Sequence, residues 1–183
     1  MRARAAVVAD APAIARIYNQ GIEDRVATFE TRSRADADIV EWFDTAFPIV
    51  VVEDLDDVIA FASTSLYRPR DCYAGIAEFS VYVRRDARGR GAGQRAMDAL
   101  LHAAEQAGYW KLVSRIFVEN VASRRLMRSL GFREVGIYEK HARLDGVWRD
   151  VVIVEKLLEK NAGRTLDAPP AQSVPVVHPS ARG

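Results

Sequence analysis

The sequence contains little cysteine and no long apolar run. Its single cysteine, Cys72, excludes a disulfide within the chain and a metal cluster of the CxxC type. No apolar stretch approaches the roughly 20 residues that a membrane-spanning helix needs, and the N-terminus carries no signal-peptide pattern. We therefore expect a soluble, cytoplasmic protein that has no membrane partner.

An excess of charge of one sign is also missing. The 26 Lys and Arg residues are balanced by 25 Asp and Glu residues, which leaves a net charge of +1. A nucleic-acid-binding protein must neutralise several phosphates at once, so we expect no nucleic-acid partner. The three histidines, His102, His141 and His178, stand far apart in the sequence. We accordingly expect no metal site.

The chain is long enough for one domain and short for two. Its 183 residues, of which 49% are hydrophobic, suffice to build one full core. The apolar periodicity ends after Glu159, and the remainder contains Pro169, Pro170, Pro175 and Pro179 among Ser, Gly and Ala. We predict one domain over residues 1–160 and a flexible, Pro-rich tail over residues 161–183.

Hydrophobic spacing divides this domain into strands and helices. Asp10 and the Ser33-Arg34-Ala35-Asp36 run are expected to cap the first two helices. In chain order we predict a strand at Ala3–Val8, helices at Ala13–Gly21 and after Ser33, strands at Ile49–Val52, Val58–Leu66 and Ala74–Val83, a helix at Gln94–Ala107, a strand at Leu112–Val118, a helix at Ala122–Leu130, and strands at Phe132–Tyr138 and Val147–Leu157. The order β-α-α-β-β-β-α-β-α-β-β is typical of an α+β fold with a mixed, mostly antiparallel sheet and flanking helices.

One stretch joins a strand, a basic glycine-rich loop and the start of a helix. The strand Glu78–Val83 leads into Arg88-Gly89-Arg90-Gly91-Ala92-Gly93, and an amphipathic helix follows from Gln94. Glycines let a ligand approach the backbone, and the first N–H groups of the helix lack intrahelical partners. The helix dipole and the arginines favour an anion there, so the stretch predicts a site for a phosphorylated ligand. A dinucleotide-binding fold is excluded because an antiparallel meander precedes the loop.

These residues resemble the GCN5-related N-acetyltransferases, the GNAT superfamily. The family's pyrophosphate signature, Gln/Arg-x-x-Gly-x-Gly/Ala, is matched by the run from Arg88 to Gly93, and a second element is matched by Asn120 and the helix that ends at Gly131-Phe132. The resemblance covers about residues 1–158. Within the family the chain is most similar to the phosphinothricin, methionine sulfoximine and arsinothricin N-acetyltransferases, on Ile17-Tyr18-Asn19, Ala27-Thr28-Phe29-Glu30-Thr31 and Asp145-Gly146-Val147-Trp148-Arg149-Asp150-Val151.

The resemblance implies acetyl-CoA as co-substrate and no metal. It implies that the pyrophosphate lies on the backbone of Gly89, Arg90, Gly91, Ala92, Gly93 and Gln94, with added charge from Arg88 and Arg90. Backbone groups of Val81, Tyr82 and Val83 would pair with the pantetheine arm, and the N–H of Val81 or a neighbour would bind the thioester oxygen. The amide of Asn120 would reach the pantetheine, cap the following helix, or do both.

Glu78 is the candidate general base, because a carboxylate in an apolar strand is unfavourable unless it faces a polar cleft. The alternative is an outward-pointing carboxylate. No acid is assigned, because Met127 occupies the position at which many family members carry a tyrosine. Tyr82, Tyr138 or a water could protonate the leaving thiolate, or it could leave unprotonated.

Acceptor binding is assigned to four residues. Arg70 and Tyr73, just before the catalytic strand, would bind an anionic group, and Phe29 and Glu30 would form another wall of the cleft. The expected reaction acetylates the α-amino group of a small, toxic, glutamate-like amino acid and so detoxifies it. The alternatives are a polyamine, an aminoglycoside or a protein N-terminus as acceptor, and a silent acyl-CoA-binding module. The resemblance also implies a homodimer.

Overall fold

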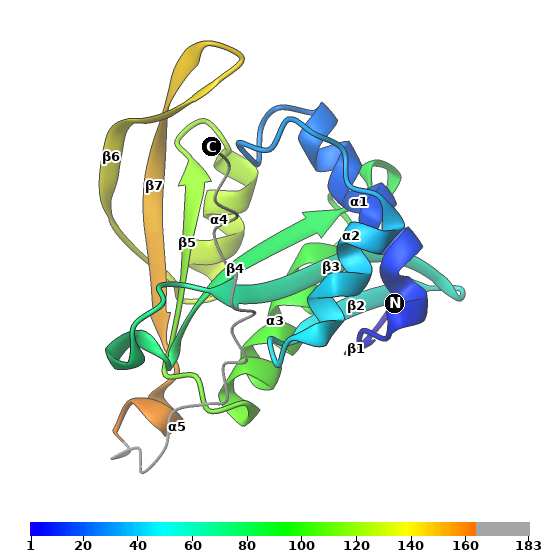
Figure 1. Ribbon diagram of the computed structural model, residues 1–183, viewed down its shortest axis with the longest axis horizontal. Helices are drawn as coiled ribbons and strands as arrows, with labels where there is room; N and C mark the ends of the chain where they lie inside the picture. The colour runs from blue at the N-terminus through cyan, green and yellow to red at the C-terminus, as the bar shows by residue number, and fades with distance from the viewer. Residues whose placement is uncertain (164–183) are drawn as a thin grey trace, which may run out of the picture.

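The structure is a computed structural model, in which residues 1–163 are described; the predicted tail from residue 164 onward lies outside them. A seven-stranded sheet forms its centre (Figure 1). The strands are β1 (Arg2–Ala5), β2 (Ile49–Asp54), β3 (Asp57–Leu66), β4 (Ile76–Val83), β5 (Lys111–Phe117), β6 (Arg133–Leu144) and β7 (Val147–Leu157). The helices are α1 (Ala11–Glu23), α2 (Asp36–Val40), α3 (Ala92–Gln106), α4 (Val121–Ser129) and α5 (Glu159–Ala162).

The sheet is mixed and mostly antiparallel. Its order is β1-β2-β3-β4-β5-β7-β6, and every neighbouring pair is antiparallel except β4 and β5, which are parallel. The predicted α+β class and the predicted order of strands and long helices are confirmed. Short 3-10 turns and α5 add to that order. In Figure 1 the β6–β7 hairpin stands at the left edge of the sheet and β1 at the right.

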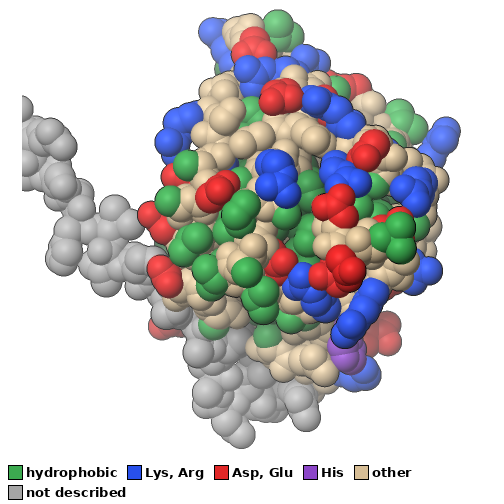
Figure 2. Space-filling model, turned by 90° about the vertical axis from the view of Figure 1, so that its right-hand side faces the viewer, with side chains coloured by type: hydrophobic (Ala, Val, Ile, Leu, Met, Phe, Trp, Pro, Cys, Tyr) green, Lys and Arg blue, Asp and Glu red, His purple; other side chains and the backbone are tan. Residues whose placement is uncertain are grey.

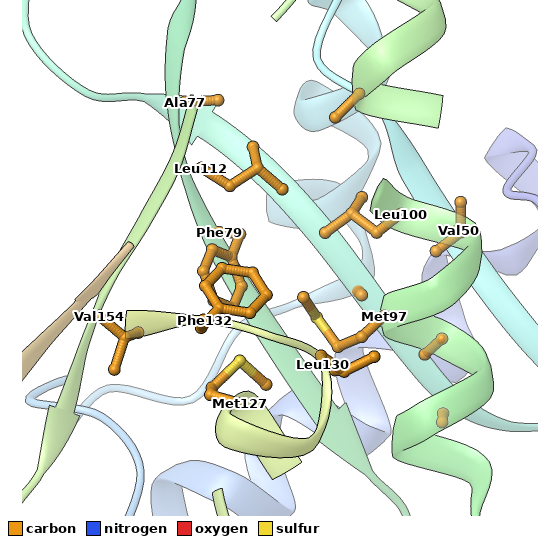
Figure 3. Packing of buried hydrophobic residues seen from close by; sticks show 14 of the residues in the cluster. Val50, Ala77, Phe79, Met97, Leu100, Leu112, Met127, Leu130, Phe132 and Val154 are labelled. Carbon is orange, nitrogen blue, oxygen red and sulfur yellow. The ribbon is translucent and has the colours of Figure 1, made fainter. Parts of the chain in front are cut away.

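Two hydrophobic clusters cover the two faces of the sheet. The larger one joins α3 and the start of β6 to the centre of the sheet, and Figure 3 shows Phe79, Met97 and Phe132 gathered in it. The second cluster joins α1 and α2 to β2 and β3. In β4, Phe79 belongs to the larger cluster whereas Tyr82 packs against the second. Because side chains alternate along a strand, Glu78 and Ser80 point to the same face as Tyr82.

The predicted helix caps are wrong in detail. The carboxylate of Asp10 does not cap α1; it accepts hydrogen bonds from the Val7 N–H at 2.8 Å and from Arg4 Nη1 at 2.7 Å. The N-cap of α2 is Ala35, whose N–H donates to Asp38 Oδ2 at 2.8 Å, and not Ser33. The Asp10 carboxylate is thus bound by groups that precede α1, and the carboxylate at the start of α2 is that of Asp38, so neither Asp10 nor Ser33 caps its helix with its side chain.

Strand β6 is longer than its apolar pattern predicts, because a bulge interrupts the alternation. The register against β7 shifts between Tyr138 and Ala142, and Lys140 adopts a positive φ of 48° within the bulge. The Lys140 N–H donates to Asp150 Oδ1 at 2.7 Å, which fixes this irregular segment to β7. A bulge moves side chains to the opposite face, so the two-residue period is lost while the strand continues.

The domain also extends past residue 160. Asn161 was predicted to begin the flexible tail, but it is buried, and its Nδ2 donates to the carbonyl oxygens of Glu105 at 2.7 Å and Tyr109 at 2.9 Å. These bonds tie α5 to the last turn of α3 and to the segment that follows it, so α5 closes that end of the core. Within residues 1–163, none of the helices is long and apolar enough to cross a membrane.

Candidate active site

A slot opens where the two parallel strands part. Strands β4 and β5 pair from Ile76 with Lys111 to Glu78 with Val113, and beyond that point they diverge, as their arrowheads in Figure 1 show. At the fork the Ser114 hydroxyl donates to the Phe79 carbonyl at 2.8 Å. A cavity of about 600 Å³ fills the space between the strands. We call this cavity the slot.

The slot reaches both faces of the sheet. Val81 and Ile116 line it and pack with the larger cluster, on the side of α3. Tyr82 and Arg115 also line it, and Tyr82 packs with α1 on the opposite side. Two reactants can therefore approach each other from opposite faces of the sheet and meet between β4 and β5.

The backbone of β4 presents alternate residues to the slot. The Arg84 N–H donates to the Ile59 carbonyl at 2.8 Å, which makes this a hydrogen-bonded pair at the end of the β3–β4 ladder. Antiparallel ladders alternate, so the backbone of Tyr82 also bonds to β3, whereas the N–H and C=O of Val81 and Val83 point to the β5 side. Past the point where the strands part, the β5 side of β4 faces the slot. The backbone N–H and C=O of Val81 therefore point into the slot without a partner on β5.

The glycine-rich loop closes one end of the slot with backbone alone. Gly89 and Gly91 have positive φ values of 74° and 85°, a conformation that glycine adopts without the strain that other residues incur. A Cβ on Gly93 would lie 3.2 Å from Leu126 and 3.3 Å from Val83, so a side chain there would crowd the slot. The first N–H groups of α3 point away from the helix without intrahelical partners. Together they form an anion-binding concavity.

The two arginines of this loop are paired with carboxylates. Arg88 Nη2 contacts Asp24 Oδ2 at 2.6 Å, and Arg90 Nη2 contacts Asp54 Oδ2 at 3.0 Å. Burial opposes ionisation of Asp24, yet hydrogen bonds from Arg85 and Arg88 outweigh it and hold the pKa of Asp24 below its usual value. The same mixing of opposite charges extends over the surface in Figure 2, where Lys and Arg alternate with Asp and Glu.

Asn120 uses both ends of its amide. Its Oδ1 accepts from the Ser123 N–H at 3.1 Å, which caps α4, and its Nδ2 donates to the Val26 carbonyl at 3.0 Å. Capping, one of the two roles expected for Asn120, is confirmed. The second bond ties the segment after α1 to the start of α4. Asn120 also lines the slot.

Sequence reasoning missed the partner of Glu78. Arg115 donates from Nε to Glu78 Oε1 at 3.1 Å, and its Nη2 contacts the same oxygen. Within residues 1–163, Arg115 lines the slot and Glu78 does not. Like Glu78, Arg115 is a charged residue within a predicted apolar strand, here Leu112–Val118, and that pattern could have identified it.

Of the residues predicted to bind the cofactor, ten line the slot: Val81, Tyr82, Val83, Arg88, Gly89, Gly91, Ala92, Gly93, Gln94 and Asn120. Arg90 is not among the lining residues in the described part of the chain.

The model of the Acetyltransferase (GNAT) family matches residues 15–132, which contain the slot, the loop and α3. The chain belongs to the GNAT acetyltransferase family. It is an acetyl-CoA-dependent N-acetyltransferase.

Relatives and solved structures agree with this membership. An L-methionine sulfoximine/L-methionine sulfone acetyltransferase of Pseudomonas aeruginosa is 35% identical over 161 residues, which cover 85% of this chain and 94% of that protein. The ribosomal-protein-alanine N-acetyltransferase of Brucella melitensis has a TM-score of 0.82 at 31% identity, covering 86% of this chain and 99% of that one. The acetyltransferase yncA of Salmonella typhimurium, solved with its cofactor acetyl-CoA, has a TM-score of 0.83 at 29% identity, covering 86% and 94%.

The position of the usual family tyrosine lies in the core of this GNAT protein. Met127 is 1% exposed and packs in the larger cluster (Figure 3), where it does not touch the slot. Tyr82 does line the slot, but burial raises the pKa of its hydroxyl above the usual value. Burial raises the pKa of its neighbour Tyr18 as well. Met127 has no proton to donate to the leaving thiolate, and the raised pKa makes Tyr82 a weak proton donor.

The four predicted acceptor-binding residues do not line the slot in the described part of the chain. The ring of Phe29 packs edge-on against Phe117, with 4.8 Å between centroids, and Glu30 Oε2 pairs with Arg34 at 2.8 Å. Arg70 and Tyr73 lie in the β3–β4 connection, at the opposite end of β4 from the glycine loop. The eight residues of β4 span about 25 Å at roughly 3.3 Å each, so this pair is well separated from the loop.

Proposed function

We propose that this GNAT enzyme acetylates the α-amino group of a small amino acid with a polar or anionic side chain, such as methionine sulfoximine, phosphinothricin or arsinothricin. The observation that carries the proposal is the 35% identity to the Pseudomonas aeruginosa enzyme named for methionine sulfoximine, over 94% of that enzyme's length. The expected biological effect is resistance, because an acetylated amine no longer carries the charge of the parent amino acid.

The reaction proceeds by direct transfer in a ternary complex. The pyrophosphate of acetyl-CoA lies on the backbone N–H groups of Gly89–Gln94, and Arg88 adds charge when it turns from Asp24 toward the phosphates. The free N–H of Val81 donates to the thioester oxygen and stabilises the charge that develops there. Val83 pairs with the pantetheine arm, and Asn120 lies beside it.

Glu78 accepts the proton of the acceptor ammonium, directly or through a water. The amine nitrogen then forms a bond to the thioester carbon, the C–S bond breaks, and CoA leaves as the thiolate. The second proton of the attacking nitrogen, which the product amide does not keep, passes to that thiolate or to water. Arg115 fixes the Glu78 carboxylate at the fork of β4 and β5, and Oε2, the oxygen that Arg115 does not contact, is the proton acceptor.

A protein N-terminus is the second candidate acceptor. The observation in its favour is the structural likeness to the Brucella melitensis ribosomal-protein-alanine N-acetyltransferase. A peptide acceptor continues beyond its first residue, whereas a free amino acid ends in a carboxylate. The two acceptors therefore differ in the charge next to the reacting amine.

An acceptor screen that follows the release of free CoA tests the function. It compares methionine sulfoximine, phosphinothricin, arsinothricin and ordinary amino acids with spermine, an aminoglycoside and a peptide that begins with alanine. We expect the highest kcat/KM for one of the first three amino acids. If the peptide or spermine exceeds every amino acid, the proposed substrate class is wrong.

Two substitutions of Asn120 should separate its structural role from its ligand role. Asn120→Ala removes the α4 cap and should lower the free energy of unfolding by about 1 kcal/mol. Asn120→Asp keeps the cap acceptor but loses the amide donor and its bond to the Val26 carbonyl, so only the contribution of the cap to stability should recover while the affinity for CoA stays reduced. Urea unfolding and calorimetric titration with CoA measure the two quantities. Recovery of both in Asn120→Asp would show that the amide does not bind the cofactor.

We further propose a homodimer formed through the β6–β7 hairpin. The hairpin exposes several large apolar side chains, Val135, Ile137, Tyr138, Val147 and Trp148. Apolar surface of this kind is unfavourable in water and marks interaction sites when it is contiguous. Analytical ultracentrifugation should give twice the chain mass for the native protein, and a smaller mass when Ile137 and Trp148 are both replaced by Ser.

A further inference from the structure

The acceptor side of the slot contains a cation that the proposed reaction does not yet bring into contact with the acceptor. Three charged side chains line the slot in the described part of the chain, namely Asp24, Arg88 and Arg115. Asp24 and Arg88 neutralise each other beside the glycine loop. Arg115 contacts Glu78, which is not among the lining residues, so Arg115 is the charged residue that lines the slot where β4 and β5 part.

The guanidinium is only partly used by its carboxylate partner. Arg115 Nε and Nη2 form one edge of the planar guanidinium, and both contact a single oxygen, Glu78 Oε1. Nη1 makes no hydrogen bond to the described part of the chain, and the Arg115 side chain is 45% exposed. A guanidinium has five N–H donors, so Arg115 can bind a second carboxylate without releasing Glu78.

Arg115 lies on the sheet face where the acceptor would enter. Glu78 and Val113 are partners in the parallel ladder, so their side chains share a face, and Arg115 and Phe117 follow at two-residue steps on that face. Phe117 packs against Phe29, one of the residues predicted to wall the cleft. Glu78, Arg115 and Phe117 therefore share one face of the sheet, and Phe29 covers the buried ring of Phe117 on that face.

We propose that Arg115 binds the α-carboxylate of the acceptor amino acid and thereby selects free amino acids over other amines. This proposal rests on the proposed function. The α-carboxylate is attached to the same carbon as the reacting amine, so a cation that binds it must lie next to the base. Arg115 meets this condition because it touches Glu78. Arg70 lies beyond the start of β4, where only the distal group of the side chain would reach it.

The ion pair also matches the acceptor in the sign of its charges. A free amino acid is a zwitterion, with a negative carboxylate and a positive ammonium a few bonds apart. Arg115 offers the positive charge and Glu78 the negative charge side by side, so each end of the zwitterion meets its opposite. A polyamine has no carboxylate for Arg115, and the amide of a peptide bond binds a guanidinium less strongly because it is neutral.

The test compares one acceptor with and without its carboxylate. The best amino-acid acceptor of the screen and its α-carboxamide are assayed with the native enzyme, Arg115→Gln and Arg115→Lys. We expect Arg115→Gln to raise KM for the amino acid about 10- to 50-fold, the effect of losing hydrogen bonds between charged groups. KM for the carboxamide and the affinity for CoA should stay close to the native values. Arg115→Lys keeps the positive charge but not the planar guanidinium with its several donors, so its KM for the amino acid should be intermediate.

Arg133→Gln is the matched control, because Arg133 also pairs with a carboxylate of the sheet, that of Glu155, but does not line the slot. It should leave the preference for acid over carboxamide unchanged. If Arg115→Gln loses activity equally on the amino acid and on its carboxamide, the proposal is overturned, since Arg115 then acts only by positioning Glu78. A native enzyme that acetylates no amino acid overturns the proposed function and this inference together. Activity on amino acids with an unaltered preference in Arg115→Gln overturns the inference alone.

Discussion

Replacing Glu78 with Gln should lower kcat about 100- to 1,000-fold, the usual contribution of a general base. The amide cannot take the proton of the acceptor ammonium, yet its oxygen can still accept the hydrogen bonds of Arg115. The fold and the cofactor site should therefore survive the change. Stopped assays of CoA release give kcat, and calorimetric titration should show native affinity for CoA.

Glu134→Gln is the control for this result. Glu134 resembles Glu78 in its setting, since it lies on a strand, pairs with an arginine and has a side chain 28% exposed against 24% for Glu78. It pairs with Arg124 of α4 and lies away from the point where β4 and β5 part, so its variant should retain native turnover. Full activity of Glu78→Gln with a good acceptor would contradict the assignment of Glu78 as the base. The proton of the acceptor ammonium would then pass directly to water.

A negative charge at the start of α3 should prevent tight binding of the cofactor. Gln94 is the third residue of the helix and lines the slot beside the glycine loop. In Gln94→Glu the new carboxylate lies near the pyrophosphate, and two like charges a few ångströms apart in a partly buried site repel by about 2–4 kcal/mol. The Kd for CoA should rise roughly 100-fold, and the rise should shrink as salt is added.

The stability of Gln94→Glu should change little, because the helix N-terminus favours a carboxylate while Asp98, one turn on, opposes it. Gln106→Glu places the same charge at the other end of α3, about 18 Å away at roughly 1.5 Å per residue. That variant should bind CoA as the native protein does. An unchanged Kd in Gln94→Glu would mean that the pyrophosphate does not lie on this loop.

The glycine loop shows how the protein holds the site before the cofactor arrives. Arg88 and Arg90 do not project freely into solution; they pair with Asp24 and Asp54 from other elements. Compensating the charges in this way avoids repulsion between adjacent arginines. It leaves the backbone N–H groups, which have no such partners, as the part of the loop that we propose binds the pyrophosphate.

Local patterns predicted most of the fold. Strands and helices follow from apolar spacing over a few residues, and the α+β order followed from their succession. The failures were local as well. Lys140 lies in a bulge that hides the strand period of β6. Neither α1 nor α2 has a side-chain cap, because the Asp10 carboxylate is bound to Arg4 and Val7 and the N-cap of α2 is Ala35, so neither Asp10 nor Ser33 has the expected role.

The sequence by itself determined the glycine-rich loop, the strand that precedes it and the family, because each depends on residues that are neighbours in the chain. Only the tertiary structure decided which groups meet across the slot. Arg115 reaches Glu78 over 37 positions, Arg88 reaches Asp24 over 64, and Asn120 reaches Val26 over 94. Apolar periodicity reports which face of an element is buried but carries no information on which distant polar group lies opposite. The divergence of β4 and β5 after Glu78, which creates the slot, becomes visible only when the strands are placed side by side.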